Sequence, residues 1–211
     1  MSSGRLYIIS APSGAGKTTL VRQLITGTER LTVSISHTTR PIRPGETHGV
    51  DYFFVSQDEF KSLIDKGELL EHANVFGNFY GTAKTTVENN LKQGLDVILE
   101  IDWQGAQQIR RIQSAYLSIF ILPPSTQVLE QRLRNRGQDD EQVIARRMQE
   151  AVTEISHFDE YDYLVVNDDF DRALNELNSI IIANRLGKDR QAANLKPLLD
   201  SLLSAPENPR E

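Results

Sequence analysis

The sequence predicts a three-layer α/β fold with a central parallel five-stranded sheet. Five short runs rich in β-branched and apolar residues recur along the chain, and helical patterns lie between them. Several runs are almost continuously apolar, as expected of parallel strands that helices cover on both faces. A chain of 211 residues is long enough to bury one sizeable core of this kind.

The predicted elements alternate in the order that parallel crossovers require. Strands are expected at 5–10, 31–36, 96–101, 116–122 and 162–166. Helices are expected at about 16–27, 102–113, 125–136, 140–157 and 169–186. We expect one core unit made of residues 4–36 and 85–186.

Residues 37–84 break this alternation and predict an inserted small β-rich subdomain. The stretch is rich in Thr, Gly, Pro, Tyr and Phe, and 50–55 and 69–76 resemble strands around a short helix. Ser56 and Glu59 have the S-x-x-E spacing of a capping box that would start this helix. A second exposed excursion is expected at 135–143, and 187–211 predict a helical tail.

Composition excludes several classes of protein. The formal net charge of −6 argues against a broad nucleic-acid surface, and the lack of cysteine excludes disulfides and thiolate metal sites. No apolar run approaches the about 20 residues of a membrane span, and the first ten residues lack a secretory signal. We therefore expect a cytoplasmic protein without nucleic-acid or membrane partners. The tail segment "LKPLLDSLL" leaves a homo-oligomer as an open alternative.

The segment "SAPSGAGKTT" at 10–19 predicts a phosphate-binding loop. It nearly fits G-x-x-x-x-G-K-[ST], follows an apolar strand and opens a helix, which is the context that the motif demands. Backbone N–H groups and the helix dipole would hold phosphates, Lys17 would reach them, and Thr18 would contact Mg²⁺. The predicted ATP-binding residues of this loop are Ala11, Pro12, Ser13, Gly14, Ala15, Gly16, Lys17, Thr18 and Thr19. A turn that merely needs glycine is the weaker alternative.

Ala11 stands where the motif has its first glycine. Alanine disfavours a positive φ, but Pro12 pushes residue 11 toward extended backbone. We therefore expect that the loop tolerates alanine at this position.

A second cluster, in "HTTRPIRPGETHGVDYFF", predicts a clamp for a phosphate monoester. Arg40 and Arg43 are three residues apart, and neighbouring prolines hold the chain extended. Two guanidinium groups and the Tyr52 hydroxyl suit a phosphate. Two solvated surface arginines are the alternative.

A third cluster, in "LLEHANVFGNFYGT", contains a carboxylate on an apolar strand. A buried carboxylate needs donors, and guanine offers N1–H and N2–H₂ as a pair for Glu71. Thr82 and Ser36 would serve O6 and neighbouring atoms, and Tyr80 would reach the phosphate. An ordinary strand glutamate that faces solvent is the alternative.

Two further acidic residues lie at the carboxyl end of a predicted strand: Glu100 follows three apolar residues, and Asp102 follows a fourth, Ile101. Active-site groups gather at such ends in open α/β sheets. One or both would hold Mg²⁺ through water or position a substrate. Asp102 also suits the N-cap of the next helix, and both roles are compatible.

Together these segments resemble the bacterial guanylate kinases, which are P-loop nucleoside monophosphate kinases. The resemblance covers about 4–186 and includes "SAPSGAGKTTL", "LLEHANVFGNFYGT", "ILEIDWQG", "RLRNRGQD" and "EYDYLVVNDD" in the family's order. It implies the P-loop NTPase fold and Mg²⁺-dependent transfer of a phosphoryl group from ATP to GMP, with dGMP as a further acceptor. The implied GMP site is Ser36, Arg40, Arg43, Tyr52, Glu71, Tyr80, Thr82 and Asp102.

The resemblance also implies a helical lid at about 130–150 and a role for its arginines. Arg136 and Arg147 would approach the transferred phosphoryl group when the lid closes, and with Lys17 they are the expected catalytic residues. Arg132 and Asn167 would lie near ATP, although a simple strand-ending turn explains Asn167 equally well. Two rivals remain: a non-catalytic guanylate-kinase-like module, against which the intact Gly16, Lys17 and Thr18 argue, and a P-loop kinase for another acceptor, against which Glu71 argues.

Overall fold

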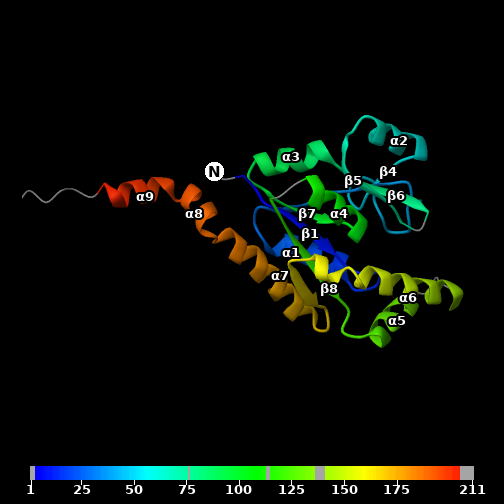
Figure 1. Cartoon of the computed structure of the whole chain (residues 1–211). Coiled ribbons are helices and arrows are strands. Elements are labelled where there is room, and N and C mark those ends of the chain that lie inside the picture. The colour runs from blue at the N-terminus through cyan, green and yellow to red at the C-terminus, as the bar shows by residue number, and fades with distance from the viewer. Residues whose placement is uncertain (1–2, 76, 113–114, 136–140, 205–211) are drawn as a thin grey trace, which may run out of the picture.

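The computed structural model describes residues 3–75, 77–112, 115–135 and 141–204. Its central sheet has five parallel strands in the order β2-β7-β1-β8-β9 (Figure 1). The strands are β1 Leu6–Ser10, β2 Leu31–Val33, β7 Asp96–Glu100, β8 Tyr116–Leu122 and β9 Tyr163–Val166. The predicted fold class is therefore confirmed.

Helices cover both faces of this sheet, and strand β1 shows how the sequence sorts them. Tyr7 and Ile9 belong to the apolar cluster that includes side chains of helices α1 and α7, whereas Leu6 and Ile8 belong to the cluster that includes α3 and α4. This alternation follows from the two-residue period of a strand. The helices are α1 Lys17–Gly27, α3 Lys84–Lys92, α4 Trp103–Ile112, α5 Thr126–Arg134, α6 Glu141–Ile155 and α7 Phe170–Arg185.

A second sheet of four strands, in the order β4-β3-β6-β5, lies within residues 37–83. The strands are β3 His37–Thr38, β4 Phe53–Phe54, β5 Leu69–Val75 and β6 Asn78–Ala83, with helix α2 at Gln57–Asp65. The capping box is confirmed: Ser56 Oγ accepts from the Glu59 amide at 3.2 Å, and Glu59 Oε2 accepts from the Ser56 amide at 2.7 Å.

The structure differs from the predicted elements mainly around this second sheet. The strand expected at 50–55 shortens to two residues, and the strand expected at 31–36 ends at Val33. The Ser34 amide still bonds Ile98 O, at 2.9 Å, but the chain then leaves the central sheet for the second one. Strands β3 and β6 and helix α3 were not predicted, because none has a long apolar run or a side-chain N-cap.

After α6 the described chain forms a 3₁₀ turn, η1 Phe158–Glu160, then β9 and α7, and then the helices α8 Lys188–Asn194 and α9 Lys196–Leu203. Figure 1 shows α8 and α9 extending away from the central sheet. The buried carboxylate of Asp96 anchors their start, because it accepts from Arg185 Nε at 2.8 Å and Arg190 Nη2 at 2.7 Å. Across the described parts of the chain, none of the helices has the length and apolarity to cross a membrane.

Candidate active site

The phosphate-loop segment connects β1 to α1 at the carboxyl end of the sheet. Gly14 and Gly16 have φ values of 93° and 92°, which favour glycine, and α1 begins at Lys17 directly after Gly16. A Cβ on Gly16 would also lie 2.4 Å from Asn167 Nδ2. The loop therefore has the backbone shape and the helix N-terminus that phosphate binding requires.

Ala11 fits this loop without strain. Arg30 is the non-glycine residue with a positive φ in the described chain, so Ala11 keeps the backbone region open to alanine. Its methyl group packs against the apolar cluster beneath α1 and α7. The expectation that the loop tolerates alanine here is consistent with this geometry.

Side chains from outside the loop hold its Ala15 carbonyl. This oxygen accepts from Asn167 Nδ2 at 2.7 Å and from Arg132 Nη1 at 3.3 Å. Arg132 Nη2 in turn donates to Asn167 O at 3.0 Å. Both predicted ATP-side residues therefore lie against the loop backbone, and Asn167 is 6% exposed.

An oxygen-rich corner lies beside the loop. Thr18 Oγ1 donates to Glu100 Oε2 at 3.1 Å, so the carboxyl end of β7 meets the first turn of α1. Mg²⁺ prefers oxygen ligands, so the Thr18 hydroxyl and the Glu100 carboxylate, together with phosphate oxygens and water, could complete its coordination. In the described part of the chain, no cluster of three or more His, Cys, Asp or Glu forms a ready-made metal site.

Glu71 is buried at the base of a pocket between the two sheets. Thr82 Oγ1 donates to its Oε1 at 2.6 Å, and the residue is 4% exposed. The pKa of Glu71 is raised to about 7. Burial is the largest cause of this rise, the Thr82 hydrogen bond opposes it, and the nearby Asp102 adds to it. The solvent-facing alternative for Glu71 is therefore wrong.

Gly105 makes room for this carboxylate. A Cβ at Gly105 would lie 2.4 Å from Glu71 Oε2, closer than packed atoms allow. Asp102 Oδ1 accepts from the Gly105 amide at 2.9 Å, so Asp102 caps α4 as the sequence suggested. Burial raises the pKa of Asp102, whereas this amide lowers it. Helix α4 thus presents its first turn to the Glu71 pocket.

The pocket brings most of the predicted guanine-side residues together. Its lining includes Lys17, Ser36, Tyr52, Glu71, Tyr80, Glu100 and Asp102. Thr82 lies behind Glu71 and is fully buried. Residues that are more than 60 positions apart in the sequence thus converge where the second sheet meets the loop.

The two clamp arginines lie in a wider cleft that continues from this pocket. Arg40 is 9% exposed, because its Nη2 donates to Glu46 Oε1 at 2.8 Å and its guanidinium lies over the Tyr52 ring, 5.5 Å from the centroid. Glu46 Oε2 also accepts from the Arg43 amide at 2.8 Å. Burial raises the pKa of Tyr52 to about 12, so its hydroxyl stays a donor at neutral pH. Arg40 is therefore not the solvated arginine of the alternative reading.

The lid contributes Arg147 to the same cleft. The lining includes Thr18 of α1, Arg147 of α6, and Arg40, Arg43 and Tyr52 from the segment between β3 and β4. Arg136, the other predicted lid arginine, lies outside the described residues.

The base of the lid packs on the start of α4. Trp103 stacks on His157, with ring centroids 3.8 Å apart and planes 11° apart. His157 Nδ1 lies 2.5 Å from Glu160 Oε1, and Glu160 also pairs with Arg110 of α4. The residue after Asp102 is thereby connected to the segment that follows α6.

Sequence reasoning missed three residues of this region: Glu46, Gly105 and Glu154. Glu46 lies in "RPGE" beside the two arginines, which is a local signal. Glu154 accepts from the Ser13 amide at 3.0 Å, across 141 positions. Its signal is weaker: it lies seven residues after Arg147 and so shares a helix face with it. Gly105 carries no signal without the fold.

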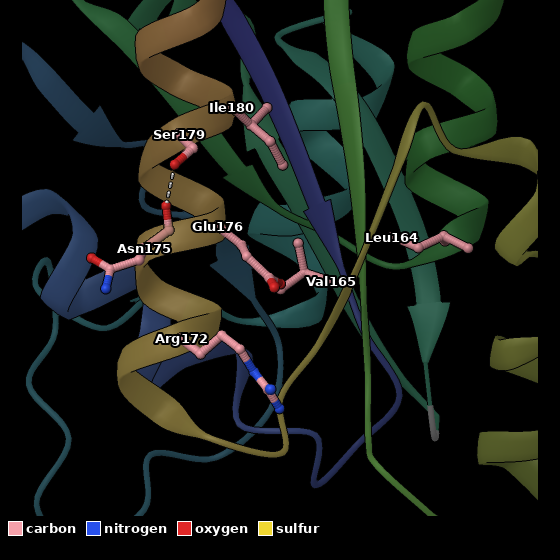
Figure 2. Close-up of a pocket in the computed structure, with 7 residues that line it drawn as sticks. All are labelled: Leu164, Val165, Arg172, Asn175, Glu176, Ser179 and Ile180. Atoms are coloured by element: carbon pink, nitrogen blue, oxygen red, sulfur yellow. Dashed lines mark hydrogen bonds between the residues drawn. The ribbon is translucent and has the colours of Figure 1, made fainter.

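A separate groove lies between β9 and α7 (Figure 2). Figure 2 shows its lining residues Leu164, Val165, Arg172, Asn175, Glu176, Ser179 and Ile180. None of the predicted site residues lies in this groove. The candidate active site is the cleft between the loop, the second sheet and α6.

Comparisons with known proteins agree with this geometry. A family model described as "Guanylate kinase" matches residues 3–184. The chain is 60% identical over 203 residues to a guanylate kinase of Methylococcus capsulatus, covering 96% of this chain and 100% of the relative. It is 58% identical to one of Hahella chejuensis, covering 97% and 99%. The crystal structure of guanylate kinase from Anaplasma phagocytophilum superposes with a TM-score of 0.79 at 35% identity, over 98% of both chains. The phosphate loop, the buried glutamate and these likenesses lead to one conclusion: the chain belongs to the guanylate kinase family.

Proposed function

We propose that this chain transfers the γ-phosphoryl group of ATP to GMP, with formation of ADP and GDP. The observation that carries the proposal is the buried Glu71 carboxylate, at the base of a pocket that opens toward the phosphate loop. A carboxylate there accepts the paired N–H donors of guanine, and adenine has no such pair on that edge. The dGMP base is the same, so dGMP is a further expected acceptor.

On the donor side, the loop amides and the N-terminus of α1 bind the phosphates of ATP, and Lys17 places its ammonium beside them. Arg147 approaches from α6 and neutralises charge on the migrating group, and we assign the same role to Arg136. Arg132 and Asn167 support the loop from behind. No general base is needed, because the second pKa of a phosphate monoester, about 6, leaves GMP ionised at neutral pH.

Thr18 would hold Mg²⁺ directly, with Glu100 or Asp102 acting through water. Bound there, the ion would neutralise charge on the phosphate oxygens of ATP. The hydroxyl and carboxylate oxygens of this corner have the right chemistry for it.

On the acceptor side, Arg40, Arg43, Tyr52 and Tyr80 bind the phosphate of GMP, and Ser36, Glu71, Thr82 and Asp102 surround the base. The enzyme then works mainly by positioning and charge neutralisation. Such an enzyme would serve purine nucleotide metabolism and the recycling of GMP.

The test is a coupled assay of ADP formation with GMP, dGMP, AMP, CMP and UMP, with and without Mg²⁺. We expect turnover with GMP and dGMP only, and only with Mg²⁺. Faster turnover with AMP than with GMP would overturn the assignment of Glu71. Tight GMP binding without turnover would instead favour a binding module.

A further inference from the structure

Helix α6 of the lid has a direct contact with the phosphate loop. Glu154 Oε2 accepts from the Ser13 amide at 3.0 Å. The segment Ser13–Ala15 is therefore held at both ends, because Asn167 and Arg132 hold the Ala15 carbonyl. Of these three side chains, Glu154 alone comes from the helix that carries Arg147.

Glu154 and Arg147 lie on one face of α6. They are seven residues apart, which is almost two helical turns and about 10 Å along the axis. Arg147 lines the cleft, while Glu154, one residue before the helix ends at Ile155, contacts the loop. The contact thus connects the C-terminal end of α6, the helix that carries Arg147, to the phosphate loop.

The location of this carboxylate is electrostatically unfavourable. The pKa of Glu154 is raised to about 6. Burial is the largest cause of this rise, the Ser13 amide and Lys17 oppose it, and Asp102 and Glu150 add to it. An anionic ligand in the loop would add further repulsion. A carboxylate at this place needs a compensating role, and the Ser13 amide that it satisfies provides one.

We propose that Glu154 is a positioning residue for phosphoryl transfer. Its oxygen fixes the Ser13 amide, and through it both the loop that holds the donor phosphates and the end of α6 that carries Arg147. The inference rests on the proposed function for its kinetic consequences, but the contact itself can be tested without turnover.

Three variants separate the hydrogen bond from the charge. Glu154→Gln keeps an acceptor oxygen, Glu154→Ala removes it, and Glu154→Asp withdraws it by one methylene. We expect the Ala and Asp variants to lose about tenfold in kcat/KM for ATP, the size expected for one hydrogen bond. The Gln variant should stay close to wild type, and GMP affinity should change less than twofold in all three. Glu130→Gln is the control, because it removes an exposed lid carboxylate that pairs with Arg134.

A double-mutant cycle tests the connection to Arg147. If Glu154 positions Arg147, the effects of Glu154→Ala and Arg147→Ala on kcat are less than additive. The reason is that removing an arginine that is already misplaced lowers kcat less than removing a well-placed one. Strictly additive effects would overturn this connection.

Two measurements do not depend on catalysis: hydrogen exchange at the Ser13 amide, and ADP affinity by calorimetry without GMP. Glu154→Ala should speed the exchange and weaken ADP, and Glu154→Gln should do neither. Unchanged exchange in the Ala variant, or equal damage from Gln and Ala, would overturn the proposal. If the Ala variant does not fold, the Asp and Gln variants carry the same comparison. If the wild-type protein shows no turnover with GMP, the proposed function is refuted. Hydrogen exchange at Ser13 and ADP affinity would still test the role of Glu154.

Discussion

The proposed donor and acceptor halves of the cleft are held in different ways. On the donor side, side chains contact the loop backbone, at the Ser13 amide and the Ala15 carbonyl. On the acceptor side, the functional side chains contact one another: Arg40 pairs with Glu46, and Glu71 accepts from Thr82. The donor half is thus organised through its backbone and the acceptor half through paired side chains.

This difference has a consequence for sequence tolerance. Ala11 contributes only backbone to the loop, so its side chain can vary as long as the backbone keeps its shape, whereas Lys17 and Thr18 of the same loop contribute side chains. A pocket that binds through buried carboxylate and guanidinium groups depends on each side chain, because a buried group that loses its partner is destabilising. We therefore expect substitutions in the two halves to change different measured quantities.

The largest loss of turnover is expected from Lys17→Met. It removes the ammonium beside the transferred phosphoryl group, and turnover should fall by about 10³-fold. GMP affinity, measured by calorimetry, should fall only a few-fold. Lys92→Met is the control, because this exposed lysine pairs with Glu88 on the surface of α3. Equal loss of turnover and GMP affinity would show that the two halves are not separate.

Glu71→Gln tests the acceptor half. An amide cannot accept both guanine protons, so the ratio of kcat/KM for GMP over AMP should fall steeply, since sites built on hydrogen bonds discriminate by about 10⁴. KM for ATP should stay within a few-fold. Glu68→Gln, an exposed change three residues earlier, is the control. An unchanged GMP preference would refute the role of Glu71.

The pH dependence of GMP binding is a second test of Glu71 as the carboxylate that binds guanine. Burial raises the pKa of Glu71 to about 7, so the carboxyl is protonated below that pH. Guanine needs the ionised form, and GMP affinity should therefore fall as pH decreases below 7, approaching about tenfold per unit. ADP affinity should lack this dependence on Glu71. Titration calorimetry from pH 5.5 to 8 checks it, and an equal slope in Glu71→Gln would contradict it.

The raised pKa of Glu71 also affects the free energy of unfolding, and in the opposite direction: low pH weakens GMP binding but stabilises the ligand-free fold. Because the folded-state pKa of Glu71 lies above its ordinary value of 4.5, the buried acid is favoured at low pH, and its contribution is lost as pH rises through about 7. Urea unfolding of the ligand-free protein should show lower stability at pH 8 than at pH 5.5. Glu71→Gln should reduce that difference; no reduction would indicate that Glu71 is ionised throughout.

The smallest effect is expected from Glu46→Gln. Burial raises the pKa of Glu46, but its bonds with Arg40 and the Arg43 amide lower it below the ordinary range, so it is ionised at neutral pH. Removing the charge loosens Arg40, and GMP affinity should fall about threefold to tenfold, as for one charge-assisted hydrogen bond. ATP affinity should not change. Tighter GMP binding would mean that Glu46 competes with the phosphate.

The central sheet was predictable because its strands are apolar runs with helices between them. The second sheet was harder, since β3 and β4 are two residues long and depend on neighbours such as β6 for pairing. Glu71 was recognisable because a carboxylate in an apolar strand is unusual. Glu154 was not, because its partner Ser13 is 141 positions away and only the packed lid brings them together.

The stack of Trp103 on His157 gives the protein an intrinsic fluorescent probe at this contact. Trp103 is the single tryptophan of the chain, so intrinsic indole fluorescence comes from one place. That place lies between the guanine-side Asp102 and the segment that follows α6. A change in emission on adding GMP or ADP would report movement at the base of the lid without any label. Stopped-flow fluorescence can therefore follow any such change in real time, in the unmodified protein.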